Sequence, residues 1–72
     1  MKTSLRKLRQ KARLTQVELA ERTGIRQTSI SALELGKVPD PRISTVRRLA
    51  HALDEPIHTV AAIFPDPEPG PW

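Results

Sequence analysis

Four short side chains between residues 27 and 32 have the chemistry to contact the edges of nucleic-acid bases. Gln27, Thr28 and Ser31 are polar and Ala32 is small, and helical spacing places all four on one side of a helix. A glutamine amide can pair with adenine through two hydrogen bonds, and threonine and alanine methyl groups can contact the thymine methyl. Such a helix fits the major groove of a duplex, which is about 12 Å wide. These residues therefore predict direct reading of a base sequence.

The distribution of charge favours a polyanion as the partner. The 72 residues include twelve lysines and arginines and eight acids, which gives a net charge of +4. Six of the bases lie within residues 1–13, where there is no acid, and the last eight residues carry two acids and no base. Residues 1–64 therefore carry a net charge of +6, which favours a nucleic acid. On charge alone, other partners of a small basic domain stay open.

The sequence offers few residues for a disulfide, a metal site or catalysis. The chain has no cysteine, so it can form neither a disulfide nor a thiolate zinc site. His51 and His58 lie seven residues apart with no third ligand beside them and no nucleophile, so we expect no catalytic residue, metal or cofactor. We also expect no small-molecule ligand, because so short a chain has no room for a sensing domain. No apolar run approaches the roughly 20 residues of a membrane span, and a cytoplasmic location is the simplest expectation.

Apolar residues at helical spacing predict an all-α domain with about five short helices. We expect these helices near residues 4–12, 15–23, 27–35, 41–53 and 56–64. In the fourth helix the inward positions would be Ile43, Val46, Leu49, Ala50 and Leu53. Residues 65–72, PDPEPGPW, have proline at every second position and cannot form a helix. The sequence thus predicts one domain, residues 1–64, followed by an extended and mobile proline-rich tail, residues 65–72, that ends in Trp72.

The second and third predicted helices carry the best local signals. Thr15 and Glu18 have the spacing of a capping box at the start of the second helix. Gly24 stands where a left-handed residue closes that helix. The turn that follows is so short that the two helices must cross steeply, and the small Ala20 permits their close approach. The apolar residues that would then share one core are Leu19, Ile25, Ile30 and Leu33. This arrangement leaves the outer face of the third helix free of packing.

Three segments of the chain resemble a known family. They are LTQVELAERTGI at residues 14–25, ISALELGK at 30–37 and PRISTVRRLAHAL at 41–53. In their residue types and order they resemble the helix-turn-helix domain of Cro and lambda-type repressors, the XRE-like regulators, over residues 4–64. The resemblance implies a compact five-helix lambda-repressor-like domain that regulates transcription. It implies a homodimer that reads a palindromic operator in double-stranded DNA through the third helix in the major groove.

The resemblance also implies a role for individual residues. Gln27, Thr28, Ser31 and Ala32 match the base-facing positions of the recognition helix. Gln16, at the start of the second helix, matches a phosphate-binding glutamine, and helix amino ends favour anions in general. Lys37 and Arg42 match positions that contact the DNA backbone. Arg9 and Glu34 match a structural ion pair between the first and third helices.

Four positions depart from the family pattern. Arg26 replaces the usual capping serine or threonine before the third helix, and it can reach a phosphate or a guanine instead. Arg13 replaces a glycine or asparagine after the first helix. Asp54 replaces a glycine, and Glu55 replaces an apolar residue, in the connection between the fourth and fifth helices.

Two questions of association stay open at the level of sequence. Ile57, Val60, Ile63 and Phe64 of the fifth helix either close the core or form the contact between two copies, and both can hold. The alternative function is an antitoxin-like module that binds a protein, neutralises a partner enzyme and also represses its own operon. That module would use the proline-rich tail or the fifth helix.

Overall fold

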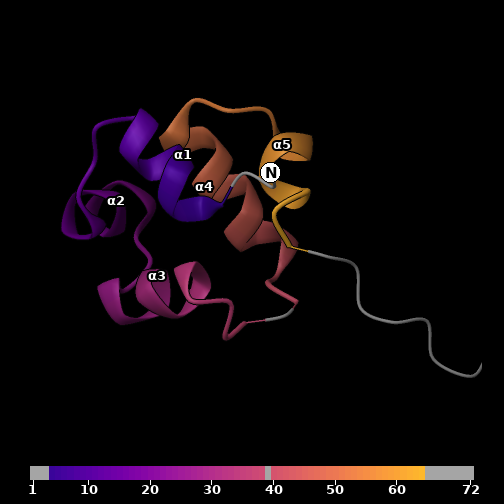
Figure 1. Ribbon diagram of the computed structural model, residues 1–72, viewed down its shortest axis with the longest axis horizontal. Coiled ribbons are helices and arrows are strands. Elements are labelled where there is room, and N and C mark those ends of the chain that lie inside the picture. Colours follow the sequence, from indigo (N-terminus) through magenta and orange to yellow (C-terminus); the bar gives the residue numbers. More distant parts are fainter. Residues whose placement is uncertain (1–3, 39, 65–72) are drawn as a thin grey trace, which may run out of the picture.

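Five α-helices make up the described part of the chain, residues 4–38 and 40–64, in the computed structural model (Figure 1). They are α1 (Leu5–Lys11), α2 (Gln16–Thr23), α3 (Gln27–Glu34), α4 (Ile43–Leu53) and α5 (Ile57–Ala61). No strand occurs in these residues, which confirms the predicted all-α class. The predicted tail, residues 65–72, lies outside the described residues.

Capping side chains mark the starts of α1 and α2. Ser4 caps α1 by accepting a hydrogen bond from the Lys7 amide at 3.2 Å. Thr15 and Glu18 form the predicted capping box of α2, with both hydrogen bonds at 3.1 Å. Arg26 precedes α3 without a side-chain cap, as its type predicts.

The fifth helix is shorter than predicted and starts after Pro56. Beyond Ala61 the backbone tightens, because the amides of Ile63 and Phe64 donate to carbonyls three residues back, those of Val60 and Ala61. This tighter turn ends the α-helix before residues 62–64.

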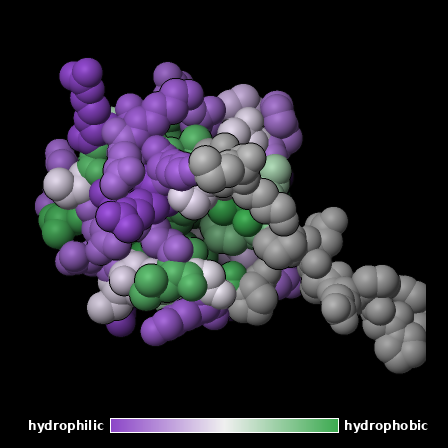
Figure 2. Space-filling view, in the orientation of Figure 1, coloured by the Kyte–Doolittle hydropathy of each residue, from purple (hydrophilic) through white to green (hydrophobic). Residues whose placement is uncertain are grey.

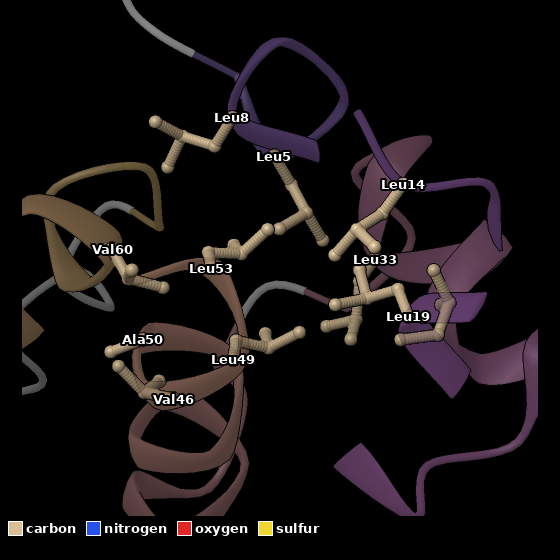
Figure 3. Close-up of a cluster of buried hydrophobic side chains, with 11 residues drawn as sticks. Leu5, Leu8, Leu14, Leu19, Leu33, Val46, Leu49, Ala50, Leu53 and Val60 are labelled. Carbon is tan, nitrogen blue, oxygen red and sulfur yellow. The ribbon is translucent and has the colours of Figure 1, made fainter. Parts of the chain in front are cut away.

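The core consists of apolar side chains from all five helices and from the turn before α2. In Figure 3, Leu5 of α1, Leu33 of α3 and Leu53 of α4 point toward a common centre. The buried apolar residues are Leu5, Leu8, Leu14, Leu19, Ile30, Leu33, Val46, Leu49, Ala50, Leu53 and Val60. Each fully buried leucine, isoleucine or valine contributes about 1.5–3 kcal/mol, so this cluster holds α3 in place against α1 and α2.

One residue predicted to face inward does not. Ile43 is 59% exposed, and the buried stripe of α4 begins one turn later, at Val46. Ile43 has the correct helical spacing, but it is the first residue of α4. Periodicity predicts which side of a helix is apolar, but it does not predict how far along the helix the neighbouring elements extend.

A polar network joins α1, the start of α2 and the end of α3. Arg9 donates to both carboxylate oxygens of Glu34, from Nε at 2.7 Å and from Nη2 at 3.2 Å. Arg9 Nη1 also donates to the carbonyl of Leu14 at 2.9 Å, and the Gln16 amide donates to Glu34 at 3.3 Å. The side chains of Arg9 and Glu34 are only 13% and 6% exposed. The expected ion pair is therefore present, and its hydrogen bonds raise the pKa of Arg9 above its usual range.

Three other departures from the family pattern, Arg13, Asp54 and Glu55, lie in connections between helices. Arg13 and Asp54 both adopt left-handed backbone conformations, with φ of 59° and 54°. Glu55 is largely buried and forms an ion pair with Lys11 at 2.9 Å. The connection between α4 and α5 is thereby tied to the end of α1.

Removing Arg9 should destabilise the domain. Arg9→Ala leaves the carboxylate of Glu34 buried without its cation, which costs about 3 kcal/mol for a pair of this kind. We expect a lower free energy of unfolding in urea, while Arg6→Ala, on an exposed residue of the same helix, should change it by less than about 0.5 kcal/mol. Unchanged stability of Arg9→Ala, with weaker binding to any duplex, would place Arg9 among phosphate contacts instead.

The capping box of α2 should make stability depend on pH. Hydrogen bonds from Thr15 lower the pKa of Glu18 from 4.5, and Arg22 adds to this effect. A lowered pKa in the folded state stabilises the fold above about pH 4.5, and this contribution is lost as the pH falls through the folded-state pKa. Glu18→Gln keeps a capping side chain but does not titrate. Wild type should therefore exceed Glu18→Gln in stability at pH 6, and the difference should shrink by pH 3. A difference that does not change with pH would contradict this account.

Candidate nucleic-acid interface

The connection between α2 and α3 consists of three residues, Gly24, Ile25 and Arg26. Gly24 adopts φ of 73° and its amide donates to the carbonyl of Ala20 at 2.9 Å, which closes α2. The hydroxyl of Thr23 is buried, where it donates to the Leu19 carbonyl at 2.7 Å and accepts from the Ile25 amide at 3.2 Å. Thr23 thus fixes the turn from within, a role that the sequence analysis did not identify. The signal was a hydroxyl at the last helical position before a glycine, where it can bond back to the preceding turn.

The two sides of α3 have different surroundings. Ile30 and Leu33 are buried in the core, whereas Gln27 and Thr28 are exposed and Ser31 is half-buried. Ala32, also half-buried, lies beside them. Within the described residues none of the polar side chains of this outer face makes a hydrogen bond, so their donors and acceptors are free for a partner.

The outer side of α3 lies at one edge of the molecule, at the bottom in Figure 1. The same edge in Figure 2 mixes weakly polar, apolar and strongly hydrophilic side chains. Leu35, which follows α3, is 67% exposed.

The residues expected to contact phosphates lie around α3. Gln16 is the first residue of α2, and Arg26 is the residue before α3. Lys37 follows α3, and Arg42 directly precedes α4. Arg26, Lys37 and Arg42 are all exposed. Each therefore presents its positive charge to solvent.

Two pockets place these polar residues next to the outer face of α3. One pocket, of about 280 Å³, is lined by Ser31 and Gln16, together with Arg6, Arg9, Glu34 and Leu35. A second pocket, of about 410 Å³, is lined by Ala32 and Ser29 on one side and by Arg42 on the other. The structure thus brings Gln16 beside Ser31 and Arg42 beside Ala32. It also brings Arg6 into the neighbourhood of Gln16, whereas the sequence indicated for Arg6 only an exposed basic side chain.

The four residues considered for the contact between two copies differ in their burial. Val60 is fully buried in the core, so it cannot be part of a surface contact, and its place among the interface candidates was wrong. Ile57, three residues earlier on α5, is 45% exposed. Ile63 and Phe64 are half-buried and pack against the core. Val60 is the one buried residue of α5, and it lies on the side of the helix that packs against α4. Ile57 is partly exposed to solvent.

The described residues hold no group of three potential metal ligands among histidine, aspartate and glutamate. In the same part of the chain no helix has the length and hydrophobicity needed to cross a membrane.

An antitoxin and an HTH-type transcriptional regulator are among the known proteins that this chain is similar to. Antitoxin HigA1 of Mycobacterium tuberculosis, from strains CDC 1551 and H37Rv, is 44% identical over 57 residues, which cover 78% of this chain and 37% of the relative. The chain thus spans little more than a third of that protein. An uncharacterized HTH-type transcriptional regulator of Methanothermobacter thermautotrophicus is 43% identical over 53 residues, 74% of this chain and 75% of the relative. No solved structure matches the chain significantly.

A family profile described as helix-turn-helix matches residues 5–60, which include all of α1 to α4 and most of α5. The match covers most of the chain and agrees with the fold, with the short turn at Gly24 and with the free outer face of α3. The chain belongs to the helix-turn-helix family, of the Cro/lambda-repressor-like (XRE) type predicted from its sequence.

Proposed function

We propose that this protein is a sequence-specific DNA-binding regulator of transcription that places α3 in the major groove of double-stranded DNA. The observation that carries the proposal is the outer face of α3, which takes no part in the core and makes no side-chain hydrogen bond within the described residues. Gln27, Thr28, Ser31 and Ala32 read base edges from this face. Family membership and the two relatives support the proposal.

Contacts with the DNA backbone supply most of the affinity in this proposal. Gln16, Arg26, Lys37 and Arg42 lie around the outer face of α3, where they contact phosphates on both sides of the groove. Each cation that neutralises a phosphate releases a counterion, so binding weakens as salt increases.

The regulator acts as a homodimer. Two copies related by a twofold axis read half-sites about 34 Å apart on a palindromic operator. The exposed Ile57, with the half-buried Ile63 and Phe64, supplies apolar surface for the contact between copies. Selection of bound sequences from a random pool of duplexes tests this function, because a palindrome with one-turn spacing is expected. A pool that shows no enrichment would contradict it.

A second candidate function is supported by the name of one relative, an antitoxin. In this alternative the protein also binds and neutralises a partner enzyme, and it represses its own operon. The partner would be held by α5 or by residues 65–72, and the latter lie outside the described residues. Co-purification of a protein that is lost when residues 65–72 are deleted would support this candidate.

Truncation of Gln27 should relax the specificity of binding. Gln27→Ala removes an amide with two hydrogen-bonding groups, so we expect a loss of about 1–3 kcal/mol on the selected site and little change on random DNA. Fluorescence anisotropy with both duplexes measures this difference. Gln10→Ala is the same substitution at an exposed position of α1. It is the matched control and should leave both affinities unchanged. Equal losses on both duplexes for Gln27→Ala would refute direct reading by this residue.

Truncation of Lys37 should weaken binding to the selected site and to random DNA alike. Lys37→Ala removes one phosphate contact, so affinity should fall by a similar factor on the selected site and on random DNA. The slope of log K against log salt should decrease by about 1. Lys7→Ala removes the same charge from an exposed position of α1 and should leave the slope nearly unchanged. If the two variants reduce the slope equally, Lys37 acts only through net charge.

A further inference from the structure

One pocket of this domain is lined by residues outside α3. It is a groove of about 490 Å³ between the carboxyl end of α2 and the middle of α4, and we call it the α2–α4 groove. Its lining residues are Arg22, Thr23, Arg47, Arg48, His51 and Ala52. Clefts that bind ligands commonly have volumes of about 300–1,000 Å³. Three arginines and a histidine thus surround one groove of the size that holds a few side chains.

The charges of this groove are not balanced by the domain itself. Across residues 4–38 and 40–64 the two ion pairs are Arg9–Glu34 and Lys11–Glu55, and neither involves a groove residue. The nearest acid in sequence is Glu21, directly before Arg22 on α2, and it is exposed and takes part in neither of these ion pairs. The other acid of α2, Glu18, bonds through its carboxylate to Thr15. Arg22, Arg47 and Arg48 are all exposed. The groove therefore has an excess of positive charge that a bound anion would neutralise.

The position of the groove argues against the proposed operator contact as its purpose. None of its lining residues belongs to α3 or to the loop after α3. Arg48 lies close to the turn before α3, since its Nη1 would be 3.8 Å from a Cβ built on Gly24. A duplex is a rigid, convex cylinder, whereas this surface is a recess between two helices. A flexible chain can enter such a recess with its side chains, and a duplex that lies along α3 cannot.

We propose that the α2–α4 groove binds a segment of another protein that carries neighbouring aspartate or glutamate side chains. Arginine favours such a partner, because its planar guanidinium donates two parallel hydrogen bonds to one carboxylate. Three guanidiniums from two helices can hold two or more carboxylates at once. The groove would leave α3 free, so the domain can hold DNA and an acidic protein at the same time.

The test uses the whole chain and a synthetic glutamate-rich peptide, with the corresponding glutamine peptide as the uncharged control. In an NMR titration, the glutamate peptide should shift the amide signals of Arg22, Arg47 and His51, and those of Gln27 and Thr28 should stay in place. The glutamine peptide should shift neither group. Shifts in α3 instead of the groove, or no shift at all, would overturn the proposal.

Two charge variants distinguish a site from general attraction. Arg47→Gln combined with Arg48→Gln should weaken peptide binding by about tenfold or more, since the charge-assisted hydrogen bonds of two guanidiniums are lost. Arg6→Gln combined with Lys7→Gln removes the same charge from two exposed positions of α1 and should weaken peptide binding by less than twofold. Arg22→Gln, on the other helix, repeats the test if the first pair lowers the melting temperature. If the groove variants and the control variant lose peptide affinity equally, only the net charge of the domain matters, and the proposal is overturned.

Binding to DNA gives an independent result. The groove variants should have the same ratio of affinities for selected and random duplexes as the wild type. Gln27→Ala should bind the glutamate peptide with wild-type affinity. If a duplex shifts the groove signals and the peptide does not, the groove is an additional phosphate-contacting surface and the proposal is wrong. Failure of operator reading would leave the peptide result unaffected.

Discussion

The short turn between α2 and α3 is the constraint on which the exposed face of α3 depends. Gly24 closes α2 in a left-handed conformation, and the buried hydroxyl of Thr23 bonds to both sides of the turn. With only three connecting residues, α3 must cross α2 steeply, and Ile30 and Leu33 are then directed into the core. The opposite side of the same helix is left without interior contacts, which makes it available to a partner.

The network around Glu34 fixes the other end of α3. Arg9 and Gln16 both donate to this carboxylate, so α1, the start of α2 and the end of α3 are joined at one point. A small domain has a limited apolar core, and these hydrogen bonds add polar contacts between the three helices beside that core. The same network orients Gln16 beside Ser31, which places a phosphate-contacting candidate next to a base-reading candidate.

Two surfaces of this domain carry groups of basic residues. One surrounds α3 and consists of single cations in the connections between helices, a pattern suited to the separated phosphates of a duplex. The other is the α2–α4 groove, where three arginines from two helices converge on a recess. The net charge predicts attraction to polyanions in general, but only the relative position of α2 and α4 distinguishes these surfaces.

The sequence by itself determined the helical class, the starts of α1 and α2, the end of α2 and the outward side of α3, because capping residues, Gly24 and helical periodicity act over a few neighbouring residues. The pairing of Arg9 with Glu34 followed from resemblance, since no local rule joins residues 25 positions apart. Tertiary structure decided the exposure of Ile43, the burial of Val60, the length of α5 and the meeting of Arg22 with Arg47 and Arg48. Each of these depends on where one helix ends against another, and that boundary is set by the packing of the whole core.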